Sequence, residues 1–150
     1  MTDSACDLTP EVAQKLNIKV VPFYVSLNGE RYQKEGEEIS VRSFYQFMVD
    51  NPLAYPKTSL PSIEDFEQMF RKQAEAQRPT LCLCFTGKMS GCVGSARNAR
   101  ELVLEDYPDA QIEVMDTAAA TVTEAITVEN AVAIRDAGRT LEEAVIWLEA

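Results

Sequence analysis

Two clusters of hydroxyl side chains stand just ahead of segments with a helical pattern. One contains Ser90 and Gly91, which follow the apolar run Thr80–Phe85, and the other is Thr58–Ser62. The first backbone N–H groups of a helix have no partner inside the helix and carry partial positive charge, so they favour an anion. A hydroxyl can donate to that anion, and a glycine lets it approach the backbone. If the clusters converge, they could hold a single carboxylate or phosphate.

Each cluster also has a simpler interpretation. Ser90 and Ser62 can each cap their own helix, and Gly91 can be small only to allow close packing. The pattern is neither a Walker loop nor the dinucleotide fingerprint G-x-G-x-x-G, and Lys88 lies before the helix rather than in its first turn. From these residues alone, both helix capping and anion binding stay open.

The cysteines offer a second kind of chemistry. Cys82 and Cys84 alternate on a predicted strand, so both thiols should lie on one face, as in a metal or redox site. Cys6 and Cys92 form no second pair at zinc spacing, and buried cysteine commonly packs as a small hydrophobe. The chain has no His, which excludes histidine-based catalysis and His-liganded metals. We therefore predict no catalytic residue, no metal and no cofactor.

Composition limits the partners. The chain has 150 residues, enough for one domain, and a net charge of −10. Its Lys and Arg residues are scattered, which disfavours nucleic acid, and the acidic balance would be repelled by an anionic membrane surface. No apolar run approaches the length of a membrane span, and no signal peptide is visible. Free thiols without a targeting segment predict a cytoplasmic protein.

The elements that must position these side chains follow from periodicity and caps. In the first half we expect a strand over 18–27, a hairpin at Asn28-Gly29 with its return strand over 30–33, and a loop or extended segment over 51–61. Helices are predicted to start after caps at four positions, namely Thr9, Ser40, Ser62 and Thr140.

The second half alternates helix and strand. Strands are expected over 80–85 and 111–115, and helices over 63–77, 90–106 and 118–137, followed by a last helix after Thr140. This order predicts an α/β fold: a three-layer parallel-sheet domain with helices on both faces plus a small β-hairpin.

The order of several short motifs resembles the DegV family of bacterial fatty-acid-binding proteins. The resemblance runs nearly end to end, over these segments: Thr2-Asp3-Ser4 with Asp7-Leu8, Val20-Val21-Pro22, Asn28-Gly29, Ile39-Ser40, Thr58-Ser59-x-Pro61-Ser62, Ser90-Gly91 with Ser95-Ala96, and Asp116-Thr117. The motif around Thr58 is similar to T-S-Q-P-S, and the motif around Ser90 to L-S-G-T-x-x-S-A.

This resemblance implies a function. Family members bind one long-chain fatty acid in an apolar tunnel, and many present it to a separate kinase that phosphorylates its carboxylate for phospholipid synthesis. Carried onto this sequence, the carboxylate ligands are Thr58 and Ser90, with Gly91 beside them. The chain would then be a lipid-binding subunit and not an enzyme.

The sequence departs from the family pattern in four ways. Only Met1 stands where the family has an apolar first strand, a loss expected to expose sheet edges. The second lobe is absent, so residues 1–150 correspond to the N-terminal lobe. Leu60 replaces the motif's Gln, and Cys92 replaces its Thr. Half a tunnel would leave apolar surface exposed, so self-association is expected as well.

Two other functions remain as alternatives. A phosphoryl-ligand-binding enzyme domain could use the same helix N-terminus with metal-binding carboxylates at strand ends, for which Asp3 and Asp116 are candidates, although both can equally cap loops. A non-enzymatic protein-interaction domain would instead use an apolar patch as its interface.

Overall fold

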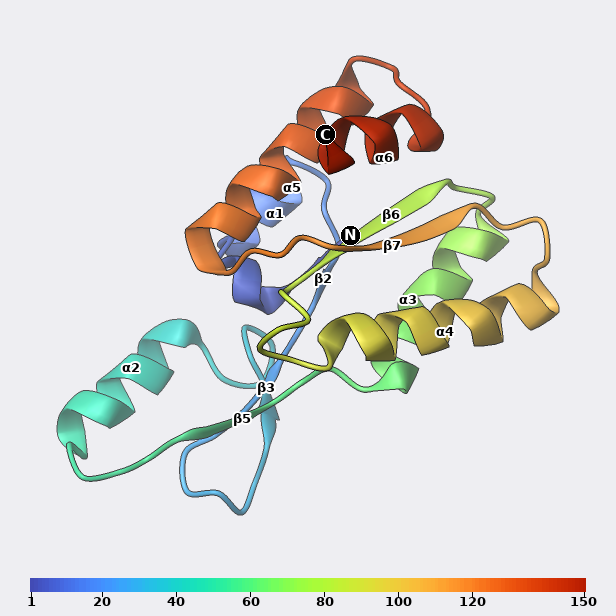
Figure 1. The fold of residues 1–150 in the computed structure, drawn as a ribbon. Coiled ribbons are helices and arrows are strands. Elements are labelled where there is room, and N and C mark those ends of the chain that lie inside the picture. Colours follow the sequence, from blue (N-terminus) through green and yellow to red (C-terminus); the bar gives the residue numbers. More distant parts are fainter.

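The computed structural model describes residues 1–150 and contains two separate sheets (Figure 1). One is a parallel sheet with strand order β2-β1-β6-β7, and the other is an antiparallel sheet with order β4-β3-β5. The strands are β1 (Thr2–Asp3), β2 (Val20–Val21), β3 (Tyr24–Ser26), β4 (Gln33–Lys34), β5 (Lys57–Ser59), β6 (Thr80–Cys84) and β7 (Ile112–Asp116).

Helices cover both faces of the parallel sheet, which confirms the predicted α/β class. The helices are η1 (Ser4–Cys6), α1 (Pro10–Lys15), α2 (Val41–Asp50), α3 (Ile63–Glu75), α4 (Cys92–Asp106), α5 (Thr121–Asp136) and α6 (Leu141–Glu149). In Figure 1, α3 and α4 lie on one side of the sheet, whereas α5 and α6 lie on the other. None of these helices is long and apolar enough to pass through a bilayer.

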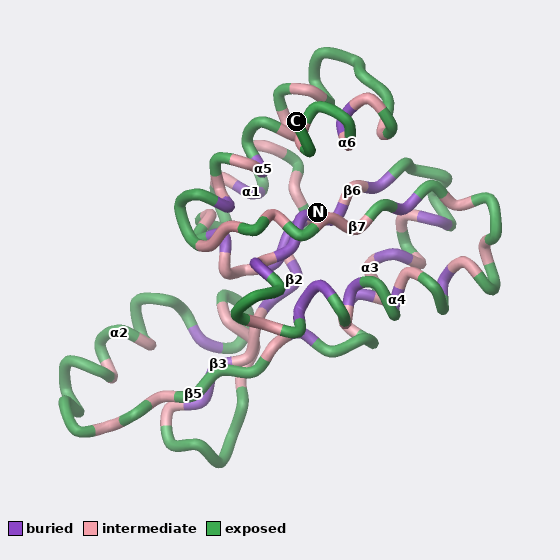
Figure 2. Tube along the Cα trace, in the orientation of Figure 1, coloured by how far each residue is buried: buried purple, intermediate pink, exposed green.

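The core lies between the parallel sheet and the α3–α4 pair. Within β6, Cys82, Leu83 and Cys84 are all buried, as expected for a strand covered on both faces. On α3, the rings of Phe66 and Phe70 stack with their centroids 6.1 Å apart, and both side chains are fully buried. Figure 2 shows the buried segments concentrated in this region. Because β6 and α4 both contribute side chains to this core, the core holds the end of β6 and the start of α4 in place.

The predicted helix caps are confirmed. The side chains of Thr9, Ser40, Ser62 and Thr140 each accept a hydrogen bond from a backbone N–H in the first turn of the following helix. Such caps satisfy donors that would otherwise lack a partner inside the helix.

The single strand predicted over 18–27 is wrong. The segment divides into β2 and β3, which belong to different sheets. Pro22 stands at the break, and because it has no backbone N–H it cannot donate to a strand ladder. β2 remains an edge strand of the parallel sheet, while β3 turns away to start the antiparallel one.

The predicted hairpin forms, but its return strand lies later than expected. The side chain of Asn28 accepts hydrogen bonds from the N–H groups of Glu30 and Arg31, so the loop is wider and pairing starts at Gln33. The segment over 51–61, expected as a loop or extended chain, contains β5, which pairs with β3. The hairpin therefore gains β5 as a third strand.

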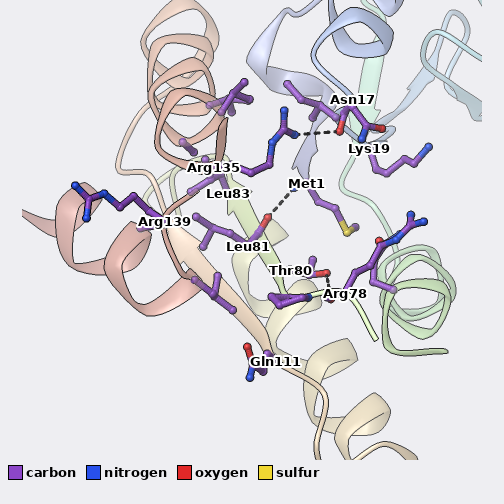
Figure 3. Close-up of a pocket in the computed structure, with 18 of the residues that line it drawn as sticks. Met1, Asn17, Lys19, Arg78, Thr80, Leu81, Leu83, Gln111, Arg135 and Arg139 are labelled. Carbon is purple, nitrogen blue, oxygen red and sulfur yellow. Dashed lines mark hydrogen bonds between the residues drawn. The ribbon is translucent and has the colours of Figure 1, made fainter. Parts of the chain in front are cut away.

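The short β1 holds the centre of the parallel sheet. It pairs with β2 and β6, and the amino group of Met1 donates to the Leu81 carbonyl at 2.6 Å. A cavity of about 600 Å³ opens ahead of Met1, between the start of the sheet and helices α5 and α6 (Figure 3). β1 is thus paired with a neighbouring strand on each side, and the cavity lies at its amino end.

Candidate functional site

Ser90 lies in the loop that joins the end of β6 to α4. Its backbone N–H donates to the Thr86 carbonyl at 3.2 Å, and its Oγ accepts from the Cys92 N–H, also at 3.2 Å. Gly91 is the residue immediately before the helix and supplies no side-chain cap. Ser90 therefore does part of the capping predicted as its simpler role, but its hydroxyl proton remains free to donate to a ligand.

Thr58 belongs to the antiparallel sheet. It lies in the middle of β5, where it pairs with Val25 of β3. All three residues of β5 are exposed, and the Thr58 hydroxyl has no protein partner. Thr58 is therefore not a helix cap, whereas Ser62, four residues on, is one.

The two motifs lie side by side. A Cβ placed on Gly91 would lie 3.4 Å from Cδ2 of Leu60, so the segment after β5 packs against the first turn of α4. Figure 1 shows this chain crossing the start of α4 on its way to α3. The structure thus brings Leu60 of one motif next to Gly91 of the other. A Cβ at position 91 would be in van der Waals contact with the end of the Leu60 side chain.

A polar cluster around Asp65 attaches the small sheet to α3. The carboxylate of Asp65 accepts hydrogen bonds from the Tyr24 hydroxyl at 2.8 Å, from Lys34 Nζ at 2.9 Å, and from both the backbone and the hydroxyl of Ser62. Burial opposes ionisation of Asp65, but these bonds outweigh it and lower the pKa of the carboxyl. We call this group, Tyr24, Lys34, Ser62 and Asp65, the Asp65 clamp.

The sequence did not predict the Asp65 clamp as a whole, although the Ser62–Asp65 spacing could have indicated part of it. The spacing from Ser62 to Asp65 is that of a capping box, which the structure confirms. Tyr24 and Lys34 are distant in sequence, so nothing in their local pattern connects them to Asp65.

Both carboxylates considered for a phosphoryl-ligand enzyme serve as loop caps. Asp3 is fully buried, and its oxygens accept from the N–H groups of Ala5 and Phe85. Asp116 accepts from the N–H groups of Gly87 and Ala118. These contacts match the capping role, and neither carboxylate contacts the Ser90 hydroxyl.

Glu124 is a buried acidic residue that the sequence analysis did not single out. Its Oε1 accepts from the Thr2 hydroxyl at 3.2 Å, while Oε2 has no partner. Burial, assisted by the nearby charge of Asp3, raises the pKa of Glu124 to about 8. The side chain is therefore neutral at neutral pH.

The cavity of Figure 3 is not this site. It lies at the amino end of the parallel sheet, and its lining includes the apolar residues Leu81, Leu83 and Val128 with Arg135 and Arg139 at its rim. Neither Thr58 nor Ser90 lines this cavity. Ser90 lies beyond the carboxyl end of β6, at the opposite end of the parallel sheet. In parallel α/β sheets ligands bind at the carboxyl ends of the strands, where Ser90 is found.

The chain was compared with known proteins. A family model described as "Uncharacterised protein, DegV family" matches residues 1–150. The chain belongs to the DegV family. A DegV domain-containing protein of Streptococcus pyogenes serotype M1 is 36% identical over the whole chain, which covers 52% of that relative.

Solved structures give the same relationship. A stearic acid-binding protein from Eubacterium ventriosum is 44% identical, with a TM-score of 0.95, and the match covers 99% of this chain and 51% of that one. A DegV family protein from Thermus thermophilus, described by its fatty acid binding, is 34% identical, with a TM-score of 0.80 and coverage of 99% and 50%. The chain therefore spans about half the length of the relatives that it matches.

Proposed function

We propose that this chain binds the carboxylate of a long-chain fatty acid between Thr58 and Ser90, with Gly91 leaving room for it at the first turn of α4. The observation that supports this proposal is the packing of Leu60 against Gly91, because Leu60 lies two residues after Thr58 and Gly91 directly follows Ser90. Similarity to a stearic acid-binding protein at 44% identity supports the choice of ligand.

The chemistry of the spot suits a carboxylate. The Thr58 and Ser90 hydroxyls have free protons, and the first turn of α4 adds backbone N–H groups with partial positive charge. Hydroxyl donors would hold the carboxylate without a salt bridge. We infer that such binding leaves its oxygens nucleophilic.

Exposed apolar side chains near these motifs suit an acyl chain or a covering lobe. Leu53, Tyr55, Ile63 and Met89 are large apolar residues that remain exposed, with Leu53 at 88%. Since the chain spans about half of its relatives, we propose that residues 1–150 act as an N-terminal lobe and that a second lobe completes the tunnel around the acyl chain.

We further propose that the bound fatty acid is presented to a separate ATP-dependent kinase. A carboxylate oxygen would attack the γ-phosphorus, the bond to ADP would break, and the resulting acyl phosphate would enter phospholipid synthesis. This step rests on the family resemblance, and the four free thiols of the chain agree with the predicted cytoplasmic setting. The chain itself would hold the substrate and leave the chemistry to its partner.

Mass spectrometry of organic extracts tests the ligand. The purified chain and a form carrying a second lobe would be extracted beside a solvent blank. We expect stoichiometric long-chain fatty acid in at least the two-lobe form, and about tenfold less in its Ser90→Ala variant, since a hydrogen bond to a charged group contributes roughly 1.5–3 kcal/mol.

Thr127→Ala provides the matched control, because Thr127 is a hydroxyl on α5 that donates only to the Thr123 carbonyl of its own helix. Fatty acid absent from both forms, or retained equally by the Ser90 and Thr127 variants, would overturn the proposal.

A further inference from the structure

Three buried side chains that can ligate a metal meet where β1, β6 and α4 come together. One ligand atom each from Asp3, Cys84 and Cys92 lies within 4.8 Å of the other two, and all three residues are 0% exposed. Cys92 Sγ lies 3.2 Å from Asp3 Oδ2. On the other side, Cys84 Sγ lies 3.8 Å from Cys82 Sγ.

These separations fit one small ion. In a tetrahedral site with Zn–S bonds of about 2.3 Å, neighbouring sulfurs are about 3.8 Å apart, and a sulfur and an oxygen slightly less. The Cys92–Asp3 separation of 3.2 Å lies near this value, and Cys84 contributes a ligand atom within 4.8 Å of both.

The charge at the cluster also favours a cation. Asp3 takes part in none of the ion pairs of the structure, although its side chain is fully buried. Buried charges are normally paired or coordinate a metal. The Asp3 oxygens accept hydrogen bonds from the Ala5 and Phe85 N–H groups and from the Cys92 thiol, and no Lys or Arg side chain pairs with them.

We propose that Asp3, Cys84 and Cys92 form a structural site for one thiophilic divalent cation of the zinc class, with Cys82 as the nearest further donor. Two thiolates and one carboxylate select Zn²⁺ or Cd²⁺ over Mg²⁺ and Ca²⁺, which prefer oxygen ligands. On binding, Cys84 and Cys92 each release a thiol proton to solvent, and the hydrogen bond between Cys92 and Asp3 is replaced by one bond from each to the metal. No electron is transferred.

Such a metal site would be linked to the proposed anion site through Cys92. The backbone N–H of Cys92 donates to the Ser90 hydroxyl, so a metal on Cys92 would hold the first turn of α4 against β1 and β6. The sequence predicts no metal because its cysteines offer no second pair at zinc spacing. Asp3 and Cys92 join the C-x-C pair only through the fold.

The test uses the reduced chain with Cd²⁺ as the probe. Equilibrium dialysis and the ultraviolet thiolate-to-cadmium charge-transfer band would be followed in chain freed of lipid, so the result does not depend on fatty acid binding. We expect one Cd²⁺ per chain, a rise in the thermal unfolding midpoint, and displacement by Zn²⁺.

Two variants and one control decide the assignment. Cys92→Thr, which places the family motif's residue at this position, and Cys84→Ser should each weaken Cd²⁺ binding by more than about tenfold. Cys6→Ser should leave it unchanged, since Cys6 is a buried thiol outside the cluster. If Cys84→Ser fails to fold by circular dichroism, Cys92→Thr decides alone. No charge-transfer band in the wild-type chain, or a band retained at full strength in Cys92→Thr, would overturn the site.

Discussion

The two sheets that carry the proposed ligands are held in different ways. Ser90 follows β6 and precedes α4, whose inner face contributes five buried residues, namely Cys92, Val93, Ala96, Ala99 and Val103. Thr58 lies on a strand with no buried residue, and the neighbouring α2 has none either. The apolar core thus holds the segment with Ser90, whereas the hydrogen bonds and the single ion pair of the Asp65 clamp hold the sheet with Thr58. The difference suggests that Thr58 can adjust to a ligand around a rigid Ser90.

The largest expected effect comes from the core. Phe66→Ala should lower the free energy of unfolding by about 3–5 kcal/mol, because the side chain is fully buried and its loss leaves a cavity. Val49→Ala on α2 should change it by less than about 0.5 kcal/mol, since Val49 is 72% exposed. Urea unfolding followed by circular dichroism measures both. Similar losses in the two variants would remove the contrast between the regions.

The stability of the parallel-sheet region should also depend on pH, through Glu124. The folded pKa of Glu124 is raised to about 8 from a model-compound value of 4.5, so its contribution to stability is complete below about 4.5 and is lost as pH rises through 8. In that window stability should fall by up to about 1.4 kcal/mol per pH unit. Unfolding measured across this range should show a flatter profile for Glu124→Gln, and an unchanged slope would contradict the neutral buried carboxyl.

The Asp65 clamp can be broken separately. Asp65→Asn removes the negative charge that pairs with Lys34 and so weakens the attachment of the small sheet to α3. Because this sheet carries Thr58, we expect fatty acid affinity to fall roughly tenfold, which corresponds to the loss of one charge-assisted hydrogen bond. Amide hydrogen exchange should become faster in β3 and β5 but not in β6. Glu67→Gln is the control on the same helix, because Glu67 pairs with Arg71 away from the small sheet. Equal exchange rates in both variants would show that the clamp does not position Thr58.

The smallest effect on folding is expected from the outer face of α2. Tyr45 and Val49 are 60% and 72% exposed, so Tyr45→Glu with Val49→Lys should leave stability nearly unchanged. We propose that this face contributes to self-association of the isolated chain, because exposed apolar patches favour association. Sedimentation velocity should then show fewer dimers in the double variant. Dimers of unchanged abundance would place the contact elsewhere.

Local signals predicted most of the fold. Hydroxyl caps such as Thr9 and Ser40 satisfy helix N–H groups within a few residues, so their effect can be read from adjacent positions. The division at Pro22 was missed, because a break between two sheets depends on which strand each half finds as partner. An extended segment over 51–61 was one of the two expectations, but the pairing of β5 with β3 was missed for the same reason.

The candidate site residues stay predictions. Thr58, Ser90 and Gly91 were chosen from helix-end chemistry and motif order, and the structure places their two segments in contact through Leu60. The sequence could not provide the contact of Tyr24 with Asp65, which spans 41 positions. Nor could it bring Asp3 to Cys92, which are 89 positions apart.

The most direct test of the central claim is the ¹³C resonance of a carboxyl-labelled fatty acid bound to the two-lobe form. We predict that the resonance of the bound carboxylate differs from that of the free acid, and that Ser90→Ala and Thr58→Ala each move it toward the free position while Thr127→Ala does not. If all three variants leave the bound resonance where the wild-type protein has it, the carboxylate is held elsewhere and the proposed role of Thr58 and Ser90 is wrong.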